Sequence, residues 1–176
     1  MNRELCFTSA RELVRLIHAR KVSAREIMAA FLAQIARLNP KINAIVARLD
    51  DDKCLALADE ADRRLSRGDA VGPLHGLPFA FKDLDAAVGF PMTRGSTIFK
   101  AFMPSEDSVL VERLRQAGVI PIGKTNISEF GMGSHSYNEV YGTTLNPYDL
   151  SKTAGGSSGG AGAALAAGLL PLASGS

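Results

Sequence analysis

Two adjacent serines, Ser157 and Ser158, lie between pairs of glycines in the segment GGSSGG, which covers residues 155–160. Glycines permit backbone conformations that a side chain would block, and they let other groups approach a serine hydroxyl closely. Successive backbone N–H groups in such a turn can also form a concave site for an anion. The segment therefore predicts a reactive serine or an anion site, unless it is only a tight turn before the apolar run AGAALAAGLL.

Three interpretations of this glycine-rich segment are open. A phosphate-binding loop needs a Lys followed by Ser or Thr after the second glycine, whereas Ala161 follows Gly160 here. A nucleophile elbow fits the pattern G-x-S-x-G with Ser158 at its centre, but it needs an acid and a histidine further along the chain. All the histidines of this sequence precede Ser158. The third interpretation is a structural turn without chemistry.

A lysine is the other candidate for the base. Lys82 ends the apolar run LPFAFK. At the end of a buried strand its ammonium group would be desolvated, which lowers the pKa and can make the amine a base near neutral pH. The alternative is a surface lysine that pairs with Asp83 or Asp85. Neither Lys82 nor the serine pair decides between these alternatives alone.

Strands and helices must alternate to position these residues. The alternation in LPFAFKD predicts a strand over residues 77–83, and VIPIGKTN predicts a short buried strand over 119–126. A helix between them should end just before Gly118, and AGAALAAGLL favours a buried helix followed by a strand. Alternating strands and helices indicate an α/β architecture.

The N-terminal part is predicted to be helical. Ser9 with Glu12, and Ser23 with Glu26, each fit a capping box at a helix start. Pro40 predicts the end of the second of these helices.

A third helix should cover residues 51–67 and end at Gly68, after a short strand within residues 43–50. We therefore expect a helical N-terminal region over about residues 1–68 and the start of an α/β core over 69–176.

Three separated stretches together resemble the amidase signature family: GLPFAFKD, GVIPIGKTNISEFGMGS and NPYDLSKTAGGSSGGAGAALAAG. They agree with the family in order and spacing, and they cover most of residues 70–176. One departure is Ala154, where many relatives have proline before the two glycines. The resemblance implies a mixed sheet between helix layers, incomplete in this chain, with residues 1–176 forming the N-terminal part of a single domain.

Members of this family hydrolyse amides, or transfer their acyl groups, through a Ser–Ser–Lys triad. By resemblance, Lys82 is the lysine, Ser157 is the bridging serine, which is usually in a cis peptide, and Ser158 helps to hold the network. A neutral Lys82 would take a proton from Ser157, and Ser157 would take one from the attacking serine.

A second loop resembles the family's acyl-site loop, although an ordinary turn would explain it equally well: Gly131, Met132 and Gly133. The polar residues just before it, Thr125, Asn126 and Glu129, are more typical of a capped strand-to-helix junction than of catalysis.

The family's attacking serine lies about two dozen residues after the bridging serine, in a segment like D-x-G-G-S whose glycines also supply the oxyanion donors. Counted from Ser157, that position falls beyond Ser176. We therefore expect this chain to be truncated just before the nucleophile, to be inactive alone, and to aggregate through uncovered sheet edges. Ser174 and Ser176 are weaker candidates for the nucleophile, since neither follows paired glycines.

Composition favours an ordinary globular protein. Hydrophobic residues make up 46% and charged residues 22% of the 176 residues, and the net charge is only +2. This balance argues against nucleic acid as a main partner. The N-terminus lacks the apolar core of a signal peptide, the longest uncharged stretch is rich in glycine, and Cys6 and Cys54 are too few for a disulfide framework. We expect a cytoplasmic protein that does not bind membranes.

The expected function is hydrolysis of small linear amides by the intact enzyme, without metal or organic cofactor and with homodimer formation as one possibility. Three alternatives stay open. The intact protein could be a glutaminase-type subunit of an amidotransferase complex, the chain could be a non-catalytic truncated product, or Ser158 could serve an elbow-type hydrolase.

Overall fold

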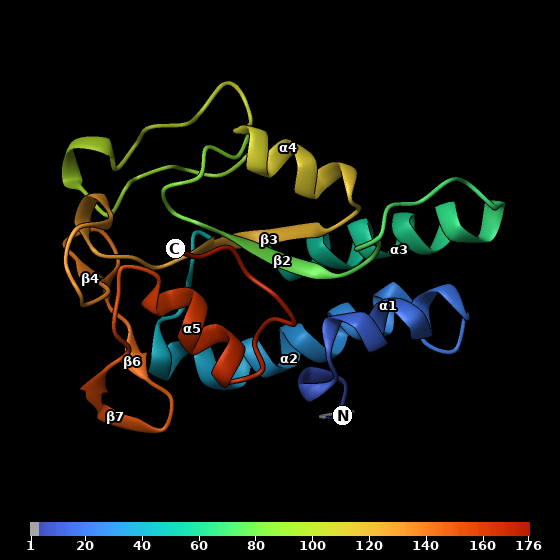
Figure 1. Cartoon of the computed structure of the whole chain (residues 1–176), viewed down its shortest axis with the longest axis horizontal. Coiled ribbons are helices and arrows are strands. Elements are labelled where there is room, and N and C mark those ends of the chain that lie inside the picture. Colours follow the sequence, from blue (N-terminus) through green and yellow to red (C-terminus); the bar gives the residue numbers. More distant parts are fainter. Residues whose placement is uncertain (1–3) are drawn as a thin grey trace.

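The computed structural model describes residues 4–176, and Figure 1 traces the backbone. The α-helices are α1 (Ala10–His18), α2 (Ala24–Ile42), α3 (Asp51–Arg67), α4 (Val109–Gln116) and α5 (Gly159–Ala166). The strands are β1 (Ile45–Val46), β2 (Pro78–Lys82), β3 (Ile120–Thr125), β4 (Tyr137–Asn138), β5 (Gly142–Thr143), β6 (Leu145–Asn146) and β7 (Asp149–Thr153). Short 3₁₀ helices are η1 (Leu5–Phe7), η2 (Thr97–Phe99) and η3 (Glu129–Gly131).

The central sheet contains β1, β3 and β2 in that order. β2 runs parallel to β3, and β1 runs antiparallel to it, so the sheet is mixed. The register places Phe81 beside Lys124 and Lys82 beside Thr125. Because β2 and β3 are parallel, Lys82 and Thr125, which end these strands, lie at the same edge of the sheet.

Helices cover both faces of this sheet. Successive residues of a strand point to opposite faces. Phe79 and Phe81 of β2 pack with Val111 of α4, whereas Ala80 and Ile122 belong to a core shared with α2, α3 and α5. Figure 1 shows α4 above the sheet and α2 and α5 below it. The predicted α/β fold, with a mixed sheet between helix layers, is confirmed.

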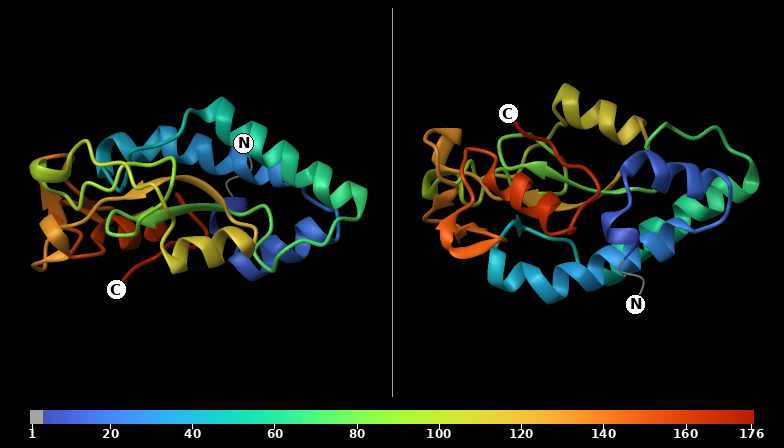
Figure 2. Two further views of the ribbon diagram at one scale, coloured as in Figure 1. Left: turned by 90° about the horizontal axis from the view of Figure 1, so that it is seen from above. Right: turned by 60° about the horizontal axis from the view of Figure 1, so that its bottom comes forward.

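Helices α2 and α3 lie side by side along the molecule (Figure 2). The predicted capping box opens α2, since Ser23 Oγ accepts from Glu26 N at 3.0 Å and the Glu26 carboxylate accepts from Ser23 N at 2.9 Å. The Asp62 carboxylate of α3 accepts from the first two amides of α2, Ala24 N at 2.7 Å and Arg25 N at 3.0 Å. This cap comes from another helix and ties α2 to α3.

Two predicted helix boundaries were wrong in part. Pro40 lies inside α2 rather than at its end, because in the last turn a missing N–H removes one hydrogen bond and leaves the rest of the helix intact. The helix ends instead at Asn43, which adopts the left-handed conformation. Ser9 Oγ accepts from Glu12 N, but Glu12 pairs with Arg15, so α1 has only half of a capping box.

The other predicted ends of helices are confirmed. Gly68 follows α3 and Gly118 follows α4 after one further residue, each with a left-handed φ, of +80° and +95° respectively. The buried helix α5 is present as predicted. The residues after it make only one β-bridge, between Ala173 and Ala80, so the predicted final strand is reduced to a bridge along β2.

The hairpins β4–β5 and β6–β7 carry no clear signal in the sequence. Asn126 does not cap a helix there, since only the short η3 follows. Its side chain donates to Gly142 O at 3.1 Å and to Thr144 Oγ1 at 3.0 Å, and accepts from Asn138 at 2.8 Å. Asn126 therefore connects the end of β3 to the hairpins that follow. The division of the chain near residue 68 stays a prediction.

Candidate active site

Lys82 is the last residue of β2, and only 3% of its surface is exposed. Its ammonium Nζ donates to two hydroxyls, Ser157 Oγ at 2.9 Å and Ser176 Oγ at 2.7 Å. Its backbone N–H donates to Ser174 Oγ at 2.8 Å. The lysine and the serine pair predicted from sequence are thus brought together from segments 75 residues apart.

Burial lowers the pKa of Lys82 because desolvation disfavours the ammonium form, while the nearby Asp85 carboxylate acts in the opposite direction. The alternative of a surface ion pair does not hold. Asp83 is fully buried and turns toward Thr93 and Gly95, and no ion pair with Lys82 is found within residues 4–176.

Ser157 is held by its backbone as well as by Lys82. The peptide bond between Gly156 and Ser157 is cis, the conformation implied by the family resemblance. Ser136 Oγ donates to Ser157 O at 3.2 Å and accepts from Gly159 N at 2.8 Å, while Ser136 N donates to Gly155 O at 2.9 Å. Ser136, which is 1% exposed, therefore fixes the whole turn around Ser157.

Gly156 must be glycine because the chain passes very close to it. A Cβ on Gly156 would lie 2.9 Å from His135 N and 3.1 Å from Ser134 C. These are backbone atoms, which cannot move aside as a flexible side chain could. The glycine that precedes Ser157 thus allows the 134–136 loop to pack against the turn.

Ser158 supports the network through the backbone of Ser176. Its Oγ donates to Ser176 O at 3.0 Å and accepts from Ser176 N at 2.9 Å. Both partners are main-chain atoms, so the contacts of Ser158 differ from the serine–histidine contact that an elbow-type hydrolase requires. Ser176, weighed only as a weak nucleophile from sequence, links Ser158 to Lys82.

The predicted loop Gly131–Gly133 does not contact Lys82. Gly131 is left-handed and packs against Leu84, while Met132 is exposed and lies with Gly133 in the wall of a pocket of about 540 Å³. The pocket is formed by residues of the range 128–139. Ser136 belongs to the same stretch of chain and holds Ser157, so the pocket lies beside the serine turn.

Sequence reasoning missed Ser136, the bridging role of Ser174, and the buried Lys124. Ser136 and Ser174 are lone hydroxyls in irregular segments, where nothing local indicates their partners. Lys124 carried a usable signal, because it stands inside the apolar strand VIPIGKTN just as Lys82 stands in its own strand.

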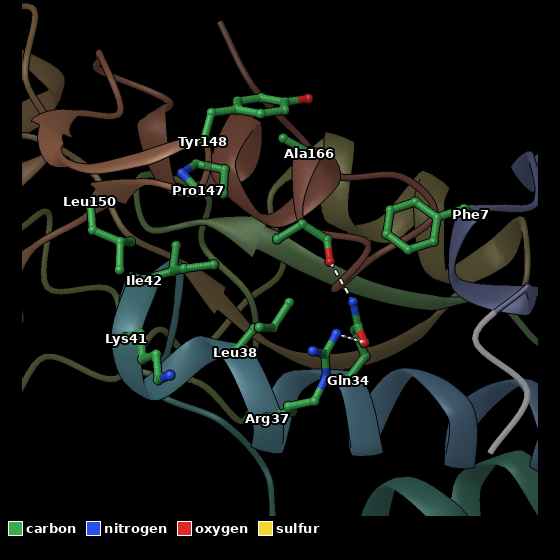
Figure 3. A pocket seen from close by; sticks show the side chains of 11 residues that line it. Phe7, Gln34, Arg37, Leu38, Lys41, Ile42, Pro147, Tyr148, Leu150 and Ala166 are labelled. Atoms are coloured by element: carbon green, nitrogen blue, oxygen red, sulfur yellow. Dashed lines mark hydrogen bonds between the residues drawn. The ribbon is translucent and has the colours of Figure 1, made fainter.

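A different pocket, of about 200 Å³, lies between α2, α5, Phe7 and the β6–β7 hairpin, and Figure 3 shows its side chains. The buried Gln34 of α2 donates to Ala167 O at 2.8 Å and accepts from Arg37 at 2.8 Å. Gln34 thus attaches α2 to the end of α5. This pocket shares no lining residue with the Lys82 cluster.

Other classes of site find little support in the part of the chain that the structure describes. No cluster of three or more His, Cys, Asp or Glu side chains suited to a metal is present among residues 4–176. Over the same residues, no helix is long and apolar enough to cross a membrane. Cys6 and Cys54 are buried thiols, and burial raises the pKa of Cys54 to about 11.

The mixed sheet brings a buried lysine to a serine in a glycine-rich turn, which is the arrangement of a candidate serine–lysine site. Comparison with known families identifies the family. The Amidase family model matches residues 26–176. The chain belongs to the amidase signature family, as the sequence resemblance indicated.

Individual relatives agree with this assignment. The chain is 44% identical over 172 residues to a glutamyl-tRNA(Gln) amidotransferase subunit of Acidothermus cellulolyticus, covering 98% of this chain and 34% of that protein. Its structure resembles a bacterial aryl acylamidase of the amidase signature family, with TM-score 0.88 and 32% identity over 95% of this chain and 35% of that one. A fatty acid amide hydrolase gives TM-score 0.90 and 28% identity over 97% and 30%. The chain spans about a third of the length of these relatives.

Proposed function

We propose that this chain supplies the lysine–serine proton relay of an amidase signature enzyme, with Lys82 as the base and Ser157 as the bridging serine. The observation that carries the proposal is the 2.9 Å contact between Lys82 Nζ and Ser157 Oγ, made by a lysine that is almost completely buried. A buried amine that is easily deprotonated, next to a hydroxyl, is a suitable proton acceptor.

The relay transfers one proton in two short steps. The neutral amine of Lys82 takes the proton of Ser157 Oγ, and Ser157 in turn takes the proton of the attacking serine as that oxygen bonds to the amide carbonyl carbon. The ammonium of Lys82 then returns the proton, through Ser157, to the departing amine. By family resemblance, the attacking serine and the oxyanion donors belong to the part of the longer relatives that lies beyond this match.

The substrate class proposed is a small linear carboxamide. The pocket beside the serine turn, with Met132 and Gly133 in its wall, is the proposed site for the acyl group or the departing amine. We also propose that the longer protein is cytoplasmic and forms a homodimer. Its proposed chemistry uses no metal or organic cofactor.

A glutaminase-type subunit of an amidotransferase complex is the second candidate. It is favoured by the 44% identity to a protein named as one subunit of glutamyl-tRNA(Gln) amidotransferase. In that case glutamine is the amide donor, and a partner protein binds the acceptor. A panel of glutamine and of aliphatic, aryl and fatty amides, each tested with and without a co-purified partner, separates the two candidates.

The relay is tested in the full-length protein with Lys82→Met and Ser157→Ala. Loss of a general base should lower kcat/KM for amide hydrolysis about 100- to 10,000-fold in each variant, with the fold retained. Lys152→Met and Ser105→Ala make the same changes at exposed positions and should leave kcat/KM within about twofold. Near-normal turnover in either relay variant would refute the assignment.

The nucleophile is located separately, by labelling the full-length protein with a fluorophosphonate and finding the modified serine by mass spectrometry. We expect the label on a serine that follows residue 176. A label on Ser158 would instead support the elbow-type hydrolase, and one on Ser174 or Ser176 would make that residue the nucleophile. Folded full-length protein that neither reacts nor turns over any amide would support a non-catalytic product.

A further inference from the structure

Asp85 connects the backbone of Lys82 to the segment that follows α5. Ser174 Oγ donates to Asp85 Oδ2 at 2.8 Å and accepts from Lys82 N at 2.8 Å. Asp85 N donates to Lys82 O at 2.9 Å and closes a tight turn directly after β2. The carboxylate of Asp85 is thus held at a fixed place near the amine of Lys82.

A second lysine reaches the same turn from the neighbouring strand. Lys124 of β3 pairs in register with Phe81, is fully buried, and donates from Nζ to the backbone carbonyl of Asp85. Its side chain thereby spans from the centre of the sheet to the turn that carries Lys82. A buried charged amine needs nearby negative charge, which Asp83 and Asp85 supply.

We propose that Asp85 and Lys124 are positioning residues for Lys82: together they fix the turn after β2 and set the balance of charge around the relay amine. The proposal rests on the proposed function of Lys82 as a base. Asp85 places a negative charge that favours the ammonium form of Lys82, and Lys124, which interacts with the Asp85 charge, places a positive charge that partly offsets it. Neither residue touches the reacting atoms.

The charges near Lys82 determine the direction in which each substitution shifts the pKa of Lys82. Removing the Asp85 charge lowers the pKa of Lys82, and removing the Lys124 charge raises it. Two other titratable groups lie near Lys124: Asp83 interacts with it directly, and Tyr141 interacts with Asp83. Tyr141 is neutral near pH 7, since burial raises its pKa to about 12. Burial also raises the pKa of Asp83, which can take up a proton when Lys124 is absent, so the Lys124 effect should be the smaller one.

The test is an NMR titration of full-length protein with ¹³C-labelled lysines, in which Lys82→Met assigns the Lys82 Cε signal. Asp85→Asn keeps an acceptor for Ser174 and removes the charge, so the midpoint for Lys82 should fall by about one pH unit. Lys124→Met should raise it by a smaller amount, because Lys124 itself loses its charge near pH 8. Asp52→Asn makes the same change on the exposed first turn of α3 and should leave the midpoint unchanged.

The acidic limb of the pH profile of kcat/KM should move with the midpoint in each variant. The titration itself does not require turnover, so a protein without amidase activity still tests this inference, while the relay variants test the function. Opposite shifts in two folded variants support the proposal, because general loosening of the turn would not reverse sign. An unchanged midpoint in either folded variant, or shifts of the same sign, would overturn it. Should Lys124→Met fail to fold, the Asp85→Asn result decides.

Discussion

Lys82 and Lys124 stand on adjacent strands, and both are buried, yet their surroundings differ. Lys82 Nζ faces the hydroxyls of Ser157 and Ser176, which can exchange protons with it. Lys124 Nζ faces the carbonyl of Asp85, which can only accept a hydrogen bond. Burial makes either amine easier to deprotonate, but only Lys82 has a neighbour through which the proton can travel.

The burial of Lys124 predicts a pH dependence of stability. Burial lowers its pKa from 10.5 to about 8, so between these values the folded protein has released a proton that the unfolded chain still holds. The free energy of unfolding should therefore gain up to about 1.4 kcal/mol per pH unit from Lys124 in this window, and lose it again as the pH falls.

Urea unfolding at several pH values checks this. Lys124→Met should lack this part of the slope above pH 8, while Lys152→Met, at an exposed position, should keep it. Equal slopes in wild type and Lys124→Met would show that the buried amine stays protonated. The comparison with wild type removes the contributions of groups that do not interact with Lys124.

At the scale of elements, α5 is made of small residues because it lies against backbone. A Cβ on Gly160 would lie 2.4 Å from both N and O of Asn126 and 2.7 Å from Ala44 O. Gly160 N also donates to Asn126 O at 3.1 Å. The helix thus rests on the ends of β1 and β3 and carries the serine turn at its first residues.

Two glycine substitutions in α5 should therefore have opposite effects on stability. Gly160→Ala forces backbone atoms apart and should cost about 3 kcal/mol, the upper end for overpacking. Gly162→Ala points into open space and should stabilise the helix by about 0.5–1 kcal/mol. Thermal or urea unfolding measures both, and a Gly160→Ala variant as stable as Gly162→Ala would contradict the close packing.

Elements with signals inside their own residues were predictable from the sequence. The alternation in β2, the helix of α3 with its closing Gly68, and the capping box at Ser23 are all local patterns. The other features of the fold depend on contacts with distant parts of the chain. The Asp62 cap on α2 comes from 38 residues away, and the hairpins near Asn126 depend on side chains that cross between loops.

At the scale of the whole molecule, the site joins three distant segments, from β2, the loop around Ser136, and the chain from Ser157 to Ser176. Lys82 and Ser157 could be predicted because an apolar strand marks the lysine and flanking glycines mark the serine. The family resemblance then predicted that the two side chains act together. Three other residues make their contacts in the site only once the sheet has formed: Ser136, Ser174 and Lys124. Their partners lie 21, 89 and 39 residues away, so no local pattern could indicate these partners, although the apolar strand around Lys124 does mark that lysine as buried.

The segment from η2 to the start of α4 carries exposed apolar side chains, among them Ile98, Met103 and Val109, of which Ile98 is 79% exposed. β2 also lies at an edge of its sheet, where a single β-bridge, between Ala80 and Ala173, covers it within residues 4–176. Exposed apolar surface and a thinly covered strand edge both favour association between chains.

The 176-residue chain alone should therefore form oligomers as its concentration rises. Replacing Ile98 and Val109 together by lysine should reduce this association without altering the fold, because both side chains point into solvent. Light scattering across a dilution series measures the mass, and circular dichroism confirms the fold. If wild type stays monomeric at every concentration, this surface does not drive association. If only the double variant becomes monomeric, the apolar side chains between η2 and α4 are responsible rather than the edge of β2.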